Sequence, residues 1–400
     1  MRILYFSPRD CWPLTTGARI RDYHLARHLA THASLTYAAL SAPGSPQPAP
    51  LPEGCGFQQI FLPRDRPYSP LKLIGGLLGP IPVTIRNYTS RRGAAALEQL
   101  LRQHDFDTVQ IEGVHLSEYV PVIRRAAPRA VILADWHNVE SELMDRYADT
   151  ASSLPRRLFA RRTARLIARS EDQLLRSCQF HTVVSELERE KLLARFPGAT
   201  VEVISNGVDL DAYRGLAPLP STGSNFVFVG SMDYHANIDA VQWFAAEIWP
   251  SIAARFPQAK FIVVGRTPPP AIRNLASPRI EITGTVEDVR SYYRDALALL
   301  VPLRVGGGTR LKILEAMAAG VPVISSRLGA EGIPASDGRH LLFAESPADW
   351  LQSVARLIED STLRTNLATQ GLALVEDQFG WSAIAGRLFD LHKSSIPARI

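Results

Sequence analysis

A glycine-rich turn in the second half of the chain has residue types that can bind a diphosphate. The turn consists of Gly306, Gly307, Gly308 and Thr309. Backbone N–H groups in such a turn are unobstructed, and the positive end of a following helix dipole favours anions. Arg310 and Lys312 add full charge and can neutralise a departing phosphate without a metal ion. The spacing of a Walker A loop is absent, which argues against a kinase or ATPase.

A histidine in the first half of the chain is a second candidate for chemistry. His137 follows the apolar run 130–134, and ligands of open α/β sheets gather beyond the carboxyl ends of strands. Asp135 and Glu140 flank it, and His115 follows an earlier apolar run. Because a lone histidine is often structural, its functional and structural interpretations both stay open here.

The elements that must position these residues alternate between apolar runs and amphipathic stretches of helix length. This alternation is typical of βαβ units around a parallel sheet, and it occurs twice. The strands expected in the first series are residues 3–6, 35–39, 108–111, 130–134 and 181–184. Those expected in the second series are residues 226–229, 261–264, 280–282, 298–301 and 321–324.

These two series predict two domains of the α/β class. We expect an N-terminal domain over residues 1–208, completed by a C-terminal helix at about 380–400, and a second domain over residues 209–379. Pro- and Gly-rich segments at 42–56 and 64–82 are long for loops inside a compact domain, which favours a functional or mobile role.

Composition is that of a globular protein without disulfides. The chain has 400 residues, of which 46% are hydrophobic, and three cysteines that lie too far apart in sequence for a metal cluster. The first apolar run is too short for a signal peptide, and the apolar region 71–85 is interrupted by glycine and proline. We therefore expect a cytoplasmic protein, either soluble or peripheral at the inner face of the membrane.

The net charge of +5 comes from the first half of the chain. Six arginines lie between residues 155 and 169, in a stretch with helical apolar periodicity. Such a helix suits an anionic membrane surface, and it equally suits a solvated helix that covers a sheet. Nucleic acid is not expected as a partner, because no aromatic interleaving or binding module accompanies the arginines.

One long segment resembles a known family. Residues 301–324 read Val-Pro-Leu-Arg-Val-Gly-Gly-Gly-Thr-Arg-Leu-Lys-Ile-Leu-Glu-Ala-Met-Ala-Ala-Gly-Val-Pro-Val-Ile. This resembles the donor site of retaining glycosyltransferases of family 4, whose GT-B fold has two Rossmann-like domains with parallel sheets that face each other across a cleft. The variant Gly-Gly-Gly-Thr-Arg-Leu-Lys-Ile-Leu-Glu-Ala suggests a subgroup similar to exopolysaccharide and cell-surface glycan enzymes. Residues 203–209, 228–231 and 284–286 also resemble family segments.

The resemblance implies roles for particular residues. Glu315 would accept hydrogen bonds from the donor ribose, although a solvated helix carboxylate is the alternative. Gly17 resembles a glycine loop beneath the donor phosphates, or is a tight turn without function. His137 would touch the donor sugar. The donor-binding residues expected are Gly17, Gly230, Thr285, Gly306, Gly307, Gly308, Thr309 and Glu315. The catalytic residues expected are His137, Arg310 and Lys312, with no metal ligand.

The sequence also departs from the family pattern. Many relatives have a glutamate eight positions before the one that matches Glu315, where this chain has Gly307. Many also have an arginine and a lysine after the first strand of the second domain, and residues 230–237 contain neither. Arg310 and Lys312 can replace these cations, which predicts an active subgroup. An inactive homologue is the alternative.

The expected function is transfer of a sugar, with retention, from a nucleoside-diphosphate sugar to a glycan or polyprenyl-linked acceptor, without cofactor or metal. A sugar-nucleotide epimerase of the same fold and a catalytically inactive nucleotide-sugar-binding homologue are the alternatives. A dinucleotide oxidoreductase is disfavoured, because neither Gly17 nor Gly230 begins a Gly-x-Gly-x-x-Gly motif.

Overall fold

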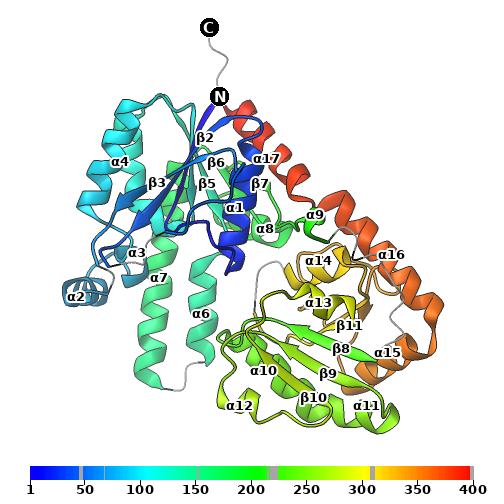
Figure 1. Cartoon of the computed structure of the whole chain (residues 1–400). Coiled ribbons are helices and arrows are strands. Elements are labelled where there is room, and N and C mark those ends of the chain that lie inside the picture. The colour runs from blue at the N-terminus through cyan, green and yellow to red at the C-terminus, as the bar shows by residue number, and fades with distance from the viewer. Residues whose placement is uncertain are drawn as a thin grey trace. The chain divides into compact units, whose positions relative to one another are not determined.

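The computed structural model describes residues 1–44, 48–66, 68–150, 153–213, 216, 224–306 and 311–396. The chain forms two compact units. Unit 1 comprises Met1–Ser205 together with Ser382–Ile400, and unit 2 comprises Asn206–Trp381. Figure 1 shows that each unit is a sheet covered by helices.

Unit 1 is built on a parallel sheet of seven described strands in the order β3-β2-β1-β4-β5-β6-β7. The strands are β1 Arg2–Ser7, β2 Ser34–Ser41, β3 Gln58–Pro63, β4 Thr108–Glu112, β5 Val131–Trp136, β6 Phe180–Val183 and β7 Val201–Val203. The central strands β4 and β5 are buried along their whole length. Strand β5 begins with an apolar run, as expected for a strand covered on both faces, whereas β4 buries the polar side chains of Gln110 and Glu112.

The helices of unit 1 connect these strands, and the last one returns from the far end of the chain. They are α1 Gly17–Leu29, α2 Pro70–Leu78, α3 Val83–Arg86, α4 Arg91–Gln103, the 3₁₀ helix η1 Val114–Tyr119, α5 Val120–Ala126, α6 Glu140–Thr150, α7 Leu154–Ser177, α8 Glu186–Arg195 and α17 Trp381–Ser395. Helix α1 begins beyond the end of β1, where the Thr16 hydroxyl accepts a hydrogen bond from the Arg19 amide. It carries the buried residues Arg21 and Asp22.

Unit 2 has a parallel sheet of six described strands in the order β10-β9-β8-β11-β12-β13. The strands are β8 Asn225–Val229, β9 Lys260–Val264, β10 Ile280–Gly284, β11 Ala296–Val301, β12 Val323–Ser325 and β13 Leu342–Phe343. The helices are α9 Leu210–Tyr213, α10 His235–Trp243, the π helix η2 Phe244–Ile248, α11 Trp249–Arg255, α12 Pro270–Arg273, α13 Arg290–Arg294, α14 Leu311–Ala318, α15 Pro347–Glu359 and α16 Ser361–Gln378.

Both sheets have the strand order of a Rossmann fold, which confirms the α/β class expected from the sequence. In such a sheet the direction in which successive strands are added reverses between the first and fourth strands, and we call this place the reversal point. Ligands bind beyond the carboxyl ends of those strands. The reversal falls between β1 and β4 in unit 1 and between β8 and β11 in unit 2.

The structure adds elements that the sequence pattern did not predict. Residues 64–82, expected as a long loop, contain α2, and β3 and β13 extend the two sheets. Ser69 caps α2 by accepting a hydrogen bond from the Lys72 amide, and Pro70 starts the helix. Within the described part of the chain, every helix is too short or too polar to cross a membrane.

Candidate active site

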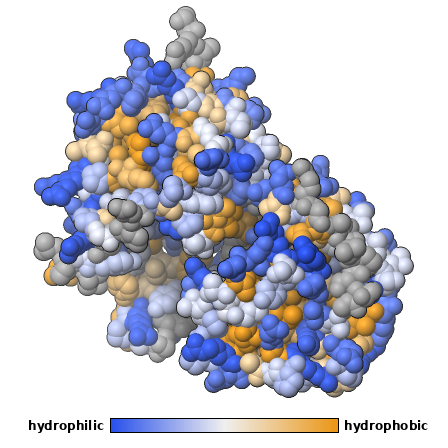
Figure 2. Space-filling model, viewed as in Figure 1, coloured by the Kyte–Doolittle hydropathy of each residue, from blue (hydrophilic) through white to orange (hydrophobic). Residues whose placement is uncertain are grey.

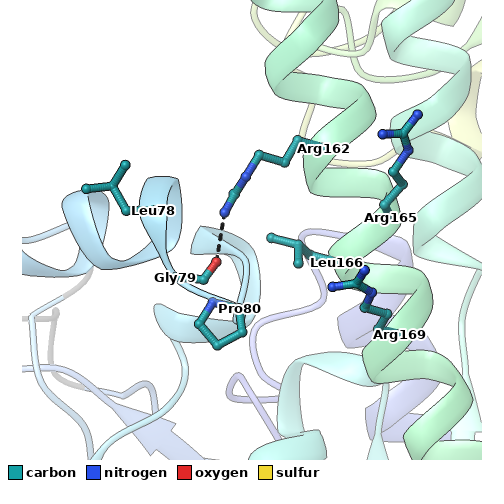
Figure 3. Close-up of a pocket in the computed structure, with 7 residues that line it drawn as sticks. All are labelled: Leu78, Gly79, Pro80, Arg162, Arg165, Leu166 and Arg169. Atoms are coloured by element: carbon teal, nitrogen blue, oxygen red, sulfur yellow. Dashed lines mark hydrogen bonds between the residues drawn. The ribbon is translucent and has the colours of Figure 1, made fainter.

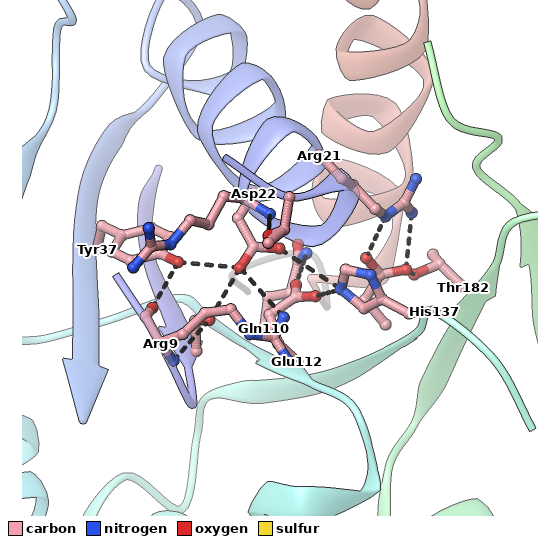
Figure 4. Close-up of polar contacts among 12 residues, drawn as sticks. Arg9, Arg21, Asp22, Tyr37, Gln110, Glu112, His137 and Thr182 are labelled. Atoms are coloured by element: carbon pink, nitrogen blue, oxygen red, sulfur yellow. Dashed lines mark hydrogen bonds and ion pairs between the residues drawn. The ribbon is translucent and has the colours of Figure 1, made fainter. Parts of the chain in front are cut away.

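A polar cluster lies at the reversal point of the unit 1 sheet. Asp22 comes from α1, Glu112 ends β4, and His137 directly follows β5 (Figure 4). His137 Nε2 lies 2.6 Å from Glu112 Oε2 and 3.5 Å from Asp22 Oδ1. Both carboxylates are fully buried, whereas the His137 side chain is 20% exposed. The exposed edge of the imidazole is therefore the part of this cluster that a ligand can reach.

The two carboxylates keep His137 protonated. Burial by itself lowers the pKa of His137, but hydrogen bonds and charges from Asp22 and Glu112 outweigh it and raise the pKa to about 10. Burial, with the charges of Asp135 and Asp22, raises the pKa of Glu112 to about 7. Although burial opposes it, His137 lowers the pKa of Asp22 through its hydrogen bond and charge. At neutral pH His137 is a hydrogen-bond donor with positive charge, and it cannot act as a general base.

Neighbouring residues fix the orientation of Glu112. Gln110 Nε2 donates to Glu112 Oε1 at 2.9 Å, and His392 Nε2 lies 3.0 Å from Gln110 Oε1. Burial lowers the pKa of His392 to about 4, so its neutral ring donates to that oxygen. Helix α17 thus reaches the cluster through His392, 282 positions away from Gln110 in sequence.

Asp22 is held in the same way. Ser7 Oγ donates to Asp22 Oδ2 at 2.9 Å, and Tyr37 Oη donates to the same oxygen at 3.0 Å. The Arg9 guanidinium lies 4.0 Å from it. These contacts come from β1, β2 and the loop after β1, so the sheet itself positions the carboxylate.

Asp135, one of the residues flanking His137, has a structural role. Arg21 binds it through two hydrogen bonds of 2.9 Å each, and Thr182 Oγ1 donates to it at 2.6 Å. Both side chains of the Arg21–Asp135 pair are buried, and Arg21 Nη1 also donates to the Ser205 carbonyl oxygen at 3.0 Å. The pair ties α1 to β5 and so positions Asp22 against His137.

The other candidates in unit 1 are His115, Glu140 and Gly17. Burial, together with the charges of Arg9 and His137, lowers the pKa of His115 to about 4, and its ring packs edge-on against Tyr88. Glu140 begins α6, and burial with the charge of Glu171 raises its pKa. Gly17 is the exposed first residue of α1, so its expected role beneath donor phosphates stays a prediction.

Asp22, Glu112 and His137 also have the residue types of a metal site. Their ligand atoms lie within 4.8 Å of one another. The 2.6 Å contact between His137 and Glu112 is a charge-assisted hydrogen bond, since the imidazole carries its proton. A metal ion here would have to displace that proton, because metal-bound imidazole is unprotonated.

In unit 2, Lys312 lies at the reversal point, in the first turn of α14. Its Nζ donates to Asn237 Oδ1 at 3.0 Å and lies 4.1 Å from the centre of the Phe228 ring. The Asn237 amide in turn donates to the Ser231 carbonyl oxygen at 2.8 Å. The ammonium group therefore has a defined position, at the carboxyl end of β8.

Gly230 makes this position accessible. A Cβ atom on residue 230 would lie 2.7 Å from Asn237 Nδ2 and 2.8 Å from Lys312 Nζ, closer than real Cβ contacts allow. A side chain on residue 230 would therefore displace the ends of the Asn237 and Lys312 side chains from these positions.

Glu315 lies on the same helix, one turn beyond Lys312, and is half-buried. Tyr293 Oη lies 3.2 Å from Glu315 Oε2 and 3.3 Å from the Lys312 carbonyl oxygen. Burial raises the pKa of Glu315, against the lowering effects of Tyr293 and Lys312. The Tyr213 ring packs beside Tyr293. Glu315 thus sits in a fixed polar recess rather than on a freely solvated helix face.

The remaining residues that the sequence predicts to bind the donor are only partly described. Gly306 has φ of 119°, a conformation that favours glycine, and Thr285 is exposed directly after Gly284, whose φ is 71°. Gly307, Gly308, Thr309 and Arg310 lie outside the described residues, so their expected roles stay predictions.

The sequence analysis missed several partners of the candidate residues. They are Asp22, Gln110, Glu112 and His392 in unit 1, and Phe228, Asn237 and Tyr293 in unit 2. Asn237 lay within the segment noted for its missing cations, and its position after β8 was the available signal. The others have no local signal, because their partners are distant in sequence.

Two Rossmann-like units, each with polar groups at its reversal point, define the GT-B class of folds. The sequence matches the family described as Glycosyltransferase Family 4 over residues 15–212 and the one described as Glycosyl transferases group 1 over residues 223–360. The chain belongs to glycosyltransferase family 4.

Individual relatives agree with this placement. The chain is 28% identical over 225 residues to a phosphatidyl-myo-inositol mannosyltransferase of Mycobacterium tuberculosis, covering 53% of this chain and 58% of that protein. It is 29% identical over 265 residues to D-inositol 3-phosphate glycosyltransferase 2 of Catenulispora acidiphila, covering 58% and 60%. The matched parts thus span less than two thirds of either relative. Among solved structures, a sucrose-phosphate synthase from Thermosynechococcus elongatus has the same fold, with a TM-score of 0.72 at 18% identity over 98% of this chain and 99% of the other.

Proposed function

We propose that this protein is a retaining glycosyltransferase that moves a sugar from a nucleoside-diphosphate sugar to an acceptor. The observation that carries the proposal is the arrangement at the start of α14. Lys312 is held at the end of β8 by Asn237 and Phe228, and Glu315 is held one turn later by Tyr293. A fixed cation and a fixed carboxylate one helical turn apart suit the diphosphate and the ribose of one nucleotide.

The donor domain is then residues 209–379, which lie within unit 2. Lys312, together with Arg310, would neutralise the nucleoside diphosphate as it leaves, and no metal ion would be needed. Glu315 would accept hydrogen bonds from the ribose hydroxyls. The half-buried recess supports this role, since removal from water strengthens such bonds.

The acceptor-side domain is then residues 1–208 with the C-terminal helix, and it contains unit 1. We assign His137 the role of a charged hydrogen-bond donor to the transferred sugar. Its raised pKa supports a donor and argues against a general base. In a retaining reaction of this kind the leaving phosphate can itself accept the proton of the attacking hydroxyl, so no protein base is required.

The acceptor proposed is a glycan or a lipid-linked alcohol used in exopolysaccharide or cell-surface glycan synthesis, at the inner face of the membrane. The names of the two relatives support a phosphate-bearing acceptor, because one acts on phosphatidyl-myo-inositol and the other on D-inositol 3-phosphate. The excess of basic residues in the first half of the chain is consistent with such an acceptor.

The test is a thermal-shift panel of nucleoside diphosphates and sugar nucleotides, with and without EDTA, followed by transfer assays with the ligands that bind. A ligand of the native state must raise the melting temperature. We expect one nucleoside diphosphate to stabilise the protein in EDTA, and its sugar nucleotide to support transfer. Isomerisation of a sugar nucleotide without acceptor would indicate an epimerase. Tight binding without any transfer would indicate an inactive homologue.

A further inference from the structure

A pocket in unit 1, distant in sequence from the donor motif, combines basic and apolar side chains. Figure 3 shows Arg162 of α7 reaching to Gly79 in the turn that follows α2, with Arg165 and Arg169 further along α7. The pocket has a volume of about 510 Å³ and is lined by Leu78, Gly79, Pro80, Arg162, Arg165, Leu166 and Arg169. This volume is in the range of ordinary small-molecule sites.

The wall opposite α7 is fixed by backbone contacts. Arg162 Nη2 donates to the Gly79 carbonyl oxygen at 2.8 Å, and Nη1 donates to that of Gly76 at 3.2 Å. A Cβ atom on Gly76 would overlap Val83 of α3, so the glycine allows α2 and α3 to pack closely. The pocket therefore has a defined width. The carbonyl oxygens carry no net charge, so they leave the positive charge of Arg162 uncompensated.

The arginines of α7 differ in their partners. Arg161 forms ion pairs with Asp145 and Asp149, at 3.1 and 2.6 Å. Arg165 and Arg169 are exposed, and the ion pairs found among the described residues include neither of them. With Arg162 they follow the spacing of one helix face. Three guanidinium groups around one pocket favour an anion with more than one negative charge, such as a phosphomonoester.

Exposed apolar side chains border the same face. Leu78 is 81% exposed and Ile74 is 56% exposed on α2, and Leu158, 62% exposed, lies one helical turn before Arg162 on α7. Figure 2 shows hydrophobic and hydrophilic side chains intermixed at this end of unit 1. Arginines beside exposed leucines match an amphiphile whose head is anionic and whose tail is a hydrocarbon.

We propose that this pocket binds the phosphomonoester or diphosphate end of a membrane lipid, with the hydrocarbon chain against Leu78, Ile74 and Leu158. Charge complementarity and the apolar border are the reasons for choosing a lipid as the occupant. The proposal rests on unit 1 alone and does not depend on the donor site proposed in unit 2.

The test is binding of the full-length protein to phosphatidylcholine vesicles that contain phosphatidic acid, whose head is a phosphomonoester. Vesicles with phosphatidylglycerol, adjusted to the same surface charge, are the lipid control. The Arg165→Gln/Arg169→Gln double variant removes two charges from the pocket. Arg156→Gln/Arg157→Gln removes two from the same helix outside the pocket lining and is the matched protein control.

We expect the wild type to prefer phosphatidic acid. Both double variants lose the same diffuse attraction to an anionic surface, because each removes two positive charges. The pocket variant should lose about tenfold more of this binding than the control variant does. Melting temperature and nucleotide binding should stay unchanged in both variants, which separates this result from any failure of the donor site. Leu78→Asn should weaken binding to vesicles but leave any binding of inorganic phosphate unchanged.

Three outcomes would overturn the proposal. Equal binding to both anionic lipids, or equal losses in the two double variants, would show diffuse electrostatic attraction. Inorganic phosphate or pyrophosphate that binds as tightly as the lipid would identify a soluble anion as the occupant. No vesicle binding at low ionic strength would exclude a lipid occupant.

Discussion

Replacement of Lys312 by alanine should lower the rate of sugar transfer sharply. The ammonium group is fixed by Asn237 at 3.0 Å and by the Phe228 ring at 4.1 Å, so it need not reorganise as negative charge develops on the leaving diphosphate. Lysine 312 is also half-buried, which places its surroundings between water and the protein interior.

The size of the effect follows from this setting. Two unit charges about 4 Å apart attract by about 1 kcal/mol in water and by about 4 kcal/mol at the effective dielectric constant of a protein surface. Each tenfold change in rate corresponds to about 1.4 kcal/mol. The half-buried position favours the upper part of that range, so Lys312→Ala should lower kcat by about 10²–10³-fold. The change in donor affinity should be smaller, because the charge is largest in the transition state.

The assay measures initial transfer rates and the dissociation constant of the nucleoside diphosphate, both in EDTA. Lys260→Ala removes an exposed lysine from the same unit and is the matched control, with an expected rate close to wild type. A Lys312→Ala protein that turns over at the wild-type rate would refute the reasoning. So would activity that EDTA abolishes and Mg²⁺ restores, since a metal ion would then neutralise the leaving group.

Further predictions address the other parts of the two sites. Glu315→Ala should keep the fold and weaken donor binding by about 1.5–3 kcal/mol, the usual contribution of a hydrogen bond to a charged group. Calorimetry measures the affinity for the donor, and the exposed control Glu281→Ala should show no loss of that affinity. Gly230→Ala should weaken donor binding and transfer, because its Cβ would lie 2.8 Å from Lys312 Nζ. Gly198→Ala, whose Cβ would meet no atom within 4 Å, should change neither. Unchanged kinetics for Gly230→Ala would contradict the packing argument. The pH profile of kcat/KM should fall as His137 loses its proton at a pKa of about 10, and Glu112→Gln should move that fall to lower pH, while Glu53→Gln at an exposed site should not. Because the pKa of His137 is raised in the folded state, its ionisation contributes stability that is fully present below about pH 6.5 and is lost as pH rises through about 10. The melting temperature should therefore also fall as pH rises through this range. If Glu112→Gln has the same pH profile of kcat/KM as the wild type, Glu112 does not control the pKa of the histidine.

Several features could be predicted from local sequence because local physics decides them. Strands buried on both faces are mostly apolar, so β1, β5 and β11 stand out as apolar runs in the sequence. The alternation of such runs with helices predicts parallel Rossmann-like sheets, and the segment 301–324 identifies the family. Each of these signals lies within a few tens of residues.

Other elements could not be predicted from the sequence, because their local sequence patterns are weak or misleading. Strand β3 lies at a sheet edge and is only partly buried, and β13 has two residues, so neither shows a clear apolar run. Helix α2 contains two glycines, and glycine usually destabilises a helix. Here Gly75 and Gly76 allow close approach of Arg86 and Val83, a requirement that only the folded chain reveals.

The sequence by itself determined the family, the sheet class and the basic, glycine-rich character of the segment that we propose binds the donor, because these depend on neighbouring residues. Only the tertiary structure decided which residues meet. His137 lies 25 positions from Glu112, His392 lies 282 from Gln110, and Lys312 lies 75 from Asn237. The protonation of His137 and the position of Lys312 follow from those contacts. The reason is physical: a side chain's pKa and orientation depend on the groups that surround it in space, and folding brings those groups from distant parts of the chain.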